Sequence, residues 1–237
     1  GKAEGAKVLT GGGKLELGGA DLSGGGELER EDTGGGKTGA LQGIDPAVLE
    51  LPAEQRSRGT VVVMHQMGSH GPAYFKRSAA ALKKFQPECT STNLQECTQA
   101  QVVNAYDNSI VETDQFLDSV INWLSAQSDK AQSAMIYVAD HGESLGENNI
   151  YLHGLPYSIA PDVQKHVPWI TWLSPAMQAR THVTTGCLQQ DVAQRRVTHD
   201  NYFHSVLGLM DVQTGAYSPA LDMFAGCRQQ PNGPLAG

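Results

Sequence analysis

The sequence contains no run of 18 apolar residues, so none of its segments is long enough to be a membrane span. It also has no basic stripe. Its 237 residues carry a formal net charge of −8, which argues against nucleic acid as the main partner. The chain begins with Gly rather than Met and has no signal-peptide pattern, so we interpret it as part of a longer protein. This length suits one α/β domain with a sizeable buried core.

Cysteine pairs of the CxxC type are absent, which weakens the case for a structural zinc site built from thiolates. Cys89 and Cys97 enclose a short polar segment. Such a segment suits a disulfide-closed loop, and hence an oxidising compartment such as a periplasm. The alternative is that all four cysteines are ordinary reduced thiols. For Cys187 and Cys227 the sequence leaves a disulfide and two thiols equally open.

Aromatic residues are absent before Tyr74, and residues 1–44 differ from the rest of the chain. About half of the 27 glycines lie in this segment, many of them in triple-Gly runs. Gly-rich polar sequence buries too little surface to offset its ordering entropy, so we interpret residues 1–44 as a flexible segment. Two runs of three Gly followed by Lys superficially resemble a phosphate-binding loop, but neither has the required spacing. A folded domain is expected over residues 45–237.

Strand and helix patterns alternate through this domain. Short apolar runs predict buried strands, and apolar residues recurring at spacings of three and four predict helices. The expected strands are 60–65, 133–139 and 167–173; the expected helices are 45–51, 101–127 and 191–209, with a helix or a loop followed by one at 72–85. This alternation predicts an α/β fold in which helices cover both faces of a mostly parallel sheet.

The expected strand over 133–139 ends abruptly in Asp140-His141-Gly142-Glu143. The carboxyl ends of such strands are where ligands of open α/β sheets bind. A carboxylate and an imidazole together suit zinc. Glu143 is then either a third ligand or a partner that orients an imidazole. The alternative is a capped turn that leads into a helix, with Gly142 at the bend.

Two further histidines, His70 and His153, lie in turns rich in Gly and Pro. A single His in a loop is usually a surface residue or one whose hydrogen bonds are satisfied. Because Asp140 and His141 are also present, we predict that all four gather around one or two zinc ions, which would clamp a phosphoryl group. The other histidines have weaker expectations: His65 and His204 structural, His199 an outer partner of the site, His166 at the cleft mouth and His182 in an exposed loop.

Several long motifs in a fixed order give the chain a specific resemblance to a known family. These motifs are His65–Tyr74, Ala105–Ile110, Asp140–Asn148, Tyr151–Pro156 and His204–Val212. They resemble the soluble catalytic domain of lipid A phosphoethanolamine transferases, which belong to the alkaline phosphatase/sulfatase superfamily and include enzymes of polymyxin (colistin) resistance. The resemblance covers about residues 59–228.

This resemblance implies a zinc-dependent enzyme with an alkaline-phosphatase-like fold. Such an enzyme is held in the bacterial inner membrane by a transmembrane domain and faces the periplasm. It moves phosphoethanolamine from phosphatidylethanolamine to a lipid A phosphate through a phospho-threonine intermediate. The resemblance implies these residue roles: Asp140 and His141 as ligands of the tightly bound zinc, His70 and His153 holding a second zinc or the phosphoethanolamine, Glu143 as an acidic residue near them, and Cys89 with Cys97 as a disulfide.

The chain departs from the family pattern in one respect that matters for catalysis. The family's remaining zinc ligand is a Glu in a Val-Gly-Glu-Thr context, and its nucleophile is a Thr in a segment ending Pro-Cys-Met-Phe-Ser. Neither motif is present before His65, so the nucleophile is unknown. We therefore expect residues 45–237 to be a partial catalytic domain, incomplete on its N-terminal side and poorly active alone. A phosphatase or sulfatase of the same superfamily and a non-catalytic metal-binding remnant remain alternatives.

Overall fold

The computed structural model describes residues 7–10, 59–129 and 131–228. The expected helix at 45–51, the two Gly-Gly-Gly-Lys runs and almost all of segment 1–44 lie outside these residues. Within segment 1–44, the strand β1 (Lys7–Thr10) pairs antiparallel with β2 (Thr60–Val63).

The described strands form three pairs, and each pair is antiparallel. β3 (Ala134–Val138) pairs with β6 (Trp169–Leu173), and β4 (Ser144–Leu145) pairs with β5 (Tyr151–Leu152). The expectation of a mostly parallel sheet is therefore wrong for the strands that the structure describes. A parallel neighbour requires a crossover, usually a helix, but the segment between β3 and β6 contains only the β4–β5 hairpin and 3₁₀ turns.

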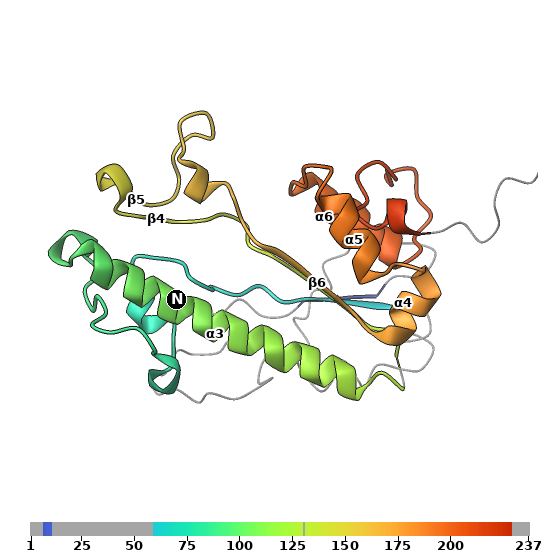
Figure 1. Cartoon of the computed structure of the whole chain (residues 1–237), viewed down its shortest axis with the longest axis horizontal. Coiled ribbons are helices and arrows are strands. Elements are labelled where there is room, and N and C mark those ends of the chain that lie inside the picture. The colour runs from blue at the N-terminus through green and yellow to red at the C-terminus, as the bar shows by residue number, and fades with distance from the viewer. Residues whose placement is uncertain (1–6, 11–58, 130, 229–237) are drawn as a thin grey trace, which may run out of the picture.

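The strand β3 is covered on both faces, as the sequence predicts. Met135 and Tyr137 point to one cluster, with Leu117 and Val120 of α3 (Gln99–Ala126). Ala134 and Ile136 point to the other, which contains residues of the helices α4 (Pro175–Thr181), α5 (Thr185–Val192) and α6 (Asp200–Leu209). Because side chains of a strand alternate between faces, one short strand anchors two helical layers. Figure 1 shows α3 on one side of β6, α5 and α6 on the other, and α4 at the end of β6.

The helices follow their sequence signals with two differences. α3 begins with a capping box, in which Thr98 and Gln101 each satisfy the other's backbone N–H. The stretch expected as one helix over 191–209 is divided, because α5 ends at Val192 and α6 begins at Asp200. The stretch 72–85 forms two 3₁₀ turns (Tyr74–Lys76 and Ala80–Leu82) instead of a helix. Within the described residues no helix is both long enough and apolar enough to cross a membrane.

Both pairs of cysteines form disulfides. Cys89 and Cys97 are joined, as expected, and Cys89 is 2% exposed beside the N-terminal turn of α3. Cys187 of α5 is joined to Cys227, which the sequence had left open. The second disulfide ties the C-terminal end of the described chain to the layer of α4, α5 and α6.

Candidate metal centre

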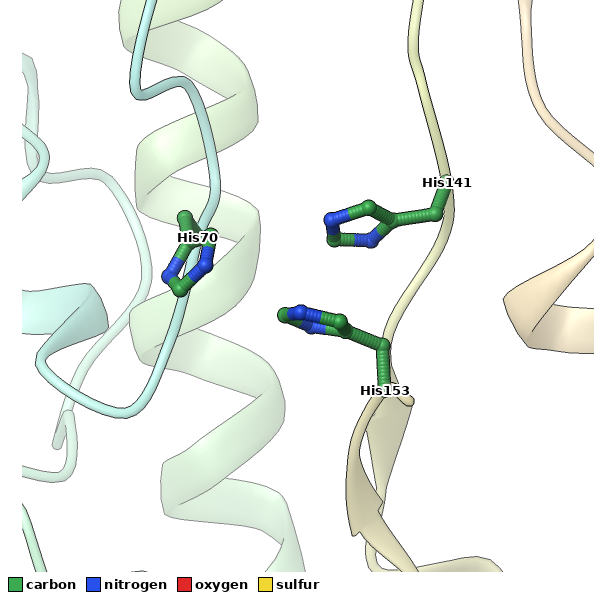
Figure 2. A group of neighbouring side chains, drawn as sticks. All are labelled: His70, His141 and His153. Carbon is green, nitrogen blue, oxygen red and sulfur yellow. The ribbon is translucent and has the colours of Figure 1, made fainter. Parts of the chain in front are cut away.

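Three of the predicted residues come together from different parts of the chain. His70 lies in the loop after β2, His141 follows β3, and His153 directly follows β5. Each offers one ring nitrogen, and these three atoms lie within 4.8 Å of one another. The rings of His141 and His153 are stacked with centroids 3.7 Å apart, and His70 meets His153 edge-on at 4.9 Å. Figure 2 shows His141 and His153 projecting from one side toward His70 on the other.

The hydrogen bonds of the three rings leave the same atom available on each. Nδ1 of His70 lies 2.6 Å from the carbonyl oxygen of Gly71, and Nδ1 of His141 lies 3.0 Å from that of Gly142. A carbonyl oxygen only accepts hydrogen bonds, so Nδ1 carries the proton in both rings. Nδ1 of His153 likewise faces the carboxylate of Glu143. In the neutral rings the lone pair is therefore on Nε2, which is the arrangement that prepares histidines to bind a metal ion.

Glu143 supports this arrangement from behind. Its side chain is buried and accepts three hydrogen bonds: from Gly71 N at 3.2 Å, from the Tyr74 hydroxyl at 3.1 Å and from His153 Nδ1 at 3.1 Å. Both carboxylate oxygens are therefore occupied by protein donors. Of the two roles that the sequence left open for Glu143, the geometry favours the partner that orients an imidazole.

Tyr74 is a part of the site to which the sequence analysis gave no role. Its side chain is 1% exposed, and burial, together with the negative charge of Glu143, raises the pKa of its hydroxyl far above the usual range. The phenol therefore stays protonated and donates to Glu143. The only sequence signal was its position four residues after His70, in the same motif.

Two glycines allow the segments to approach closely. A Cβ atom on Gly71 would lie 2.5 Å from Leu152 Cδ2 and 2.7 Å from the Tyr74 hydroxyl. A Cβ atom on Gly142 would overlap the backbone carbonyl oxygen of Val163. These are separations that real Cβ atoms do not show, so a side chain at either position requires the site to shift.

Asp140 is near this group but outside it. Its side chain is 79% exposed, and Oδ1 accepts a hydrogen bond from the backbone N–H of His141. Its Oδ2 lies 3.8 Å from His141 Nε2. Two ligands of one tetrahedral zinc are roughly 3.3 Å apart, because each is about 2.0 Å from the ion. A small rotation would thus place Asp140 and His141 on one ion, and this donor set fits zinc.

The remaining histidines lie outside the three-histidine group. Nε2 of His199 lies 2.8 Å from the carbonyl oxygen of Ala139, one residue before Asp140. His204 accepts a hydrogen bond from Ser218 N, in agreement with its structural interpretation. His199 is exposed, as are His65, His166 and His182.

Comparison with known proteins agrees with the motifs. The sulfatase family profile matches residues 42–212. The phosphoethanolamine transferase EptA of Salmonella typhimurium is 47% identical over 169 residues, which are 71% of this chain and 31% of that protein. The phosphatidylethanolamine transferase Mcr-1 of Escherichia coli is 40% identical over 174 residues, 73% of this chain and 30% of that protein. The chain thus spans less than a third of the length of these relatives.

A solved structure gives the same result for the fold. The soluble domain of lipooligosaccharide phosphoethanolamine transferase A from Neisseria meningitidis superposes with a TM-score of 0.68 at 44% identity. The match covers 70% of this chain and 50% of that domain. It confirms the expected alkaline-phosphatase-like α/β fold and the resemblance to part of such a catalytic domain.

Proposed function

The chain belongs to the sulfatase family, and we propose that it forms the zinc-binding and headgroup-binding part of a phosphoethanolamine transferase. The reaction is transfer of phosphoethanolamine from phosphatidylethanolamine to a phosphate of lipid A through a phospho-enzyme. Identity above 40% to a named phosphoethanolamine transferase across seven tenths of the chain supports this reaction class. The matched residues include every residue that we assign to the site.

The observation that carries the proposal is the three-histidine group. One ring nitrogen from each of three separate segments lies within 4.8 Å of the other two, and each ring has a hydrogen-bond partner at Nδ1. A histidine that serves only as a surface residue does not require a hydrogen bond that fixes the orientation of its ring. We assign Asp140 and His141 to the tightly held zinc, and His70 and His153 to a second zinc or to the phosphoethanolamine.

These residues would act by holding and orienting the donor. When bound, zinc polarises a phosphoryl oxygen and offsets the negative charge that develops on it. The rings of His70 and His153 meet edge-on, and one nitrogen of each lies within 4.8 Å of the other, so both could contact one ion or one phosphate oxygen. Glu143 contacts Nδ1 of His153 and so holds that ring in one orientation, which leaves Nε2 available for the ion or the donor.

The location that we propose is the periplasmic face of the bacterial inner membrane. The two disulfides support an oxidising compartment, because disulfides rarely persist in a reducing one. A two-step transfer also requires a nucleophile, and the family's Thr motif is absent from this sequence. We therefore expect the chain alone to bind zinc but to transfer little phosphoethanolamine.

Equilibrium dialysis against zinc tests the site directly. We expect His141→Ala and Asp140→Ala each to weaken zinc binding about tenfold or more. His166→Ala, which removes an exposed histidine outside the group, is the matched control and should bind as the parent does. Equal zinc affinity in all four proteins would contradict the proposal.

The family match also favours a second candidate, hydrolysis of a phosphate or sulfate ester. Chromogenic aryl phosphate and aryl sulfate esters separate the two reactions. Turnover that His141→Ala abolishes would favour the hydrolase. Zinc binding without turnover of either ester would argue against the hydrolase, since the transferase part alone is itself expected to bind zinc and to transfer little.

A further inference from the structure

The segment Leu155–Val163, which we call the tip segment, exposes apolar side chains in an unusual concentration. Tyr157 is 72% exposed and Ile159 is 67% exposed, the two largest values among the exposed large hydrophobic residues of the described chain. Leu155 and Val163 are also exposed. Figure 1 shows the segment as a loop after β5 that stands clear of the helices, at the top of the view.

This exposure belongs to an anchored loop. The backbone N–H groups of Ile159 and Ala160 both donate to the carbonyl oxygen of Pro156 at 2.9 Å, which closes a turn. Ala160 is buried, so the turn is fixed from below while its neighbours point outward. At the base, the carbonyl oxygen of Gln164 accepts from Gly142 N at 3.1 Å, and the buried Gln164 side chain donates to Ser144. The fold therefore holds Tyr157 and Ile159 in solvent.

The chemistry of the tip segment suits the boundary between water and lipid. Tyr157 has an apolar ring and a polar hydroxyl, as is common for side chains at membrane interfaces. Lys165 Nζ lies 5.3 Å from the centroid of that ring and 3.4 Å from Oδ1 of Asp162, so a pair of opposite charges accompanies the apolar residues. Long cationic side chains at such boundaries keep the charge among headgroups while their stems pack on apolar surface. The tip segment also begins only two residues after His153, at the candidate metal centre.

We propose that the tip segment is a lipid-contact surface that docks on a phospholipid bilayer. Tyr157 and Ile159 enter the layer of headgroups and upper acyl chains, and Lys165 stays among the phosphates. The proposal rests on the proposed function in one respect, since a lipid donor for the histidine group is the reason to expect a bilayer as the occupant. Docking of the tip segment would bring the histidine group to a lipid donor that lies in the bilayer surface rather than free in solution.

Sedimentation of the full chain with vesicles of phosphatidylethanolamine and phosphatidylglycerol tests this surface. The double variant Tyr157→Ser/Ile159→Ser should partition into vesicles about tenfold less well, since it removes two large apolar side chains. The matched control is Val192→Ser/Phe203→Ser, which removes two apolar side chains that are 45% and 44% exposed on α5 and α6. The control should bind vesicles as the parent does.

Three results would overturn the proposal: no vesicle binding by the parent, equal binding by parent and tip variant, or equal loss in tip variant and control. A lipid-free sedimentation run adds a fourth. Self-association of the parent that only the tip variant abolishes would show that a second copy of the chain covers the tip segment. All vesicle measurements use a metal chelator, so their outcome is separate from zinc binding by His141. A chain that binds vesicles but no zinc retains this proposal and loses the proposed function.

Discussion

Glu143→Gln tests whether the site depends on one buried charge. The carboxylate accepts three hydrogen bonds from Gly71, Tyr74 and His153. An amide of the same shape can keep its oxygen on Gly71 and His153 and turn its NH₂ toward Tyr74, whose hydroxyl then has to accept. Packing is preserved while two charge-assisted bonds become neutral and a third reverses. Charge-assisted bonds contribute about 1.5–3 kcal/mol and neutral ones about 1 kcal/mol, so we expect a loss of about 1–3 kcal/mol in unfolding free energy.

Glu143→Gln should also weaken zinc binding, by a free energy similar to this loss of stability. Groups that orient a metal-binding histidine typically contribute about 10–100-fold to metal affinity, and Glu143 is the group that orients His153. Competition with a chromogenic chelator measures zinc affinity, and urea unfolding measures stability. Asp114→Asn, which neutralises an exposed carboxylate on α3, is the matched control. If Glu143→Gln binds zinc as tightly as Asp114→Asn does, Glu143 does not orient His153 for a metal, and the reasoning is refuted.

Gly142→Ala should lower the free energy of unfolding by about 1–3 kcal/mol, because the added Cβ meets a backbone oxygen. In Gly154→Ala the added Cβ meets no atom within 4 Å. That variant should lose only about 1 kcal/mol, from the strain of a φ of +101°. Replacing Cys187 and Cys227 by Ala should destabilise by about 4 kcal/mol, against about 2.5 kcal/mol for the other disulfide, because a separation of 40 residues exceeds one of 8. Equal losses in urea unfolding would contradict that ranking. The raised pKa of Tyr74 favours its protonated form in the folded state, so its contribution is complete below about pH 10 and is lost as the pH rises further. Tyr74→Phe should therefore flatten the alkaline fall in stability by up to about 1.4 kcal/mol per pH unit between about pH 10 and pH 12, measured by urea unfolding.

The parts that were predictable from sequence are those with strong periodicity or turn chemistry. α3 was predicted to within two residues at its start and one at its end, because its apolar residues recur at helical spacing. His70 and His153 could be placed at one site because each lies in a Gly/Pro turn after an apolar segment. The stretch 191–209 is divided by a loop from 193 to 199, and the polar residues from 198 to 201 lie where α6 begins.

The parts that were not predictable depend on contacts distant in sequence. β4 and β5 are two residues each, too short for any period, and three residues of their hairpin have positive φ without being glycine: Asn148, Asn149 and Leu152. The antiparallel pairing of β3 with β6 follows from where the chain returns after that hairpin. The exposure of the Asp140 side chain likewise depends on how the backbone turns after the end of β3, which the sequence pattern does not specify. Residue type predicted the donors, and tertiary contacts decided which of them converge.

The metal centre and the tip segment share one structural support. Gly142 lies between His141 and Glu143, and its N–H donates to the carbonyl oxygen of Gln164 at the base of the tip segment. Its Cα also lies so close to Val163 that no Cβ atom fits between them. A change at Gly142 therefore displaces the histidine group and the tip segment together.

This shared support predicts an asymmetry between two variants. Gly142→Ala should weaken both zinc binding and vesicle binding, because it moves His141 and the base of the tip segment at once. Tyr157→Ser/Ile159→Ser should weaken vesicle binding alone, because both side chains point into solvent. Chelator competition and vesicle sedimentation on the same two proteins measure both quantities. A Gly142→Ala protein that loses zinc affinity but docks on vesicles normally would show that the two surfaces are supported separately.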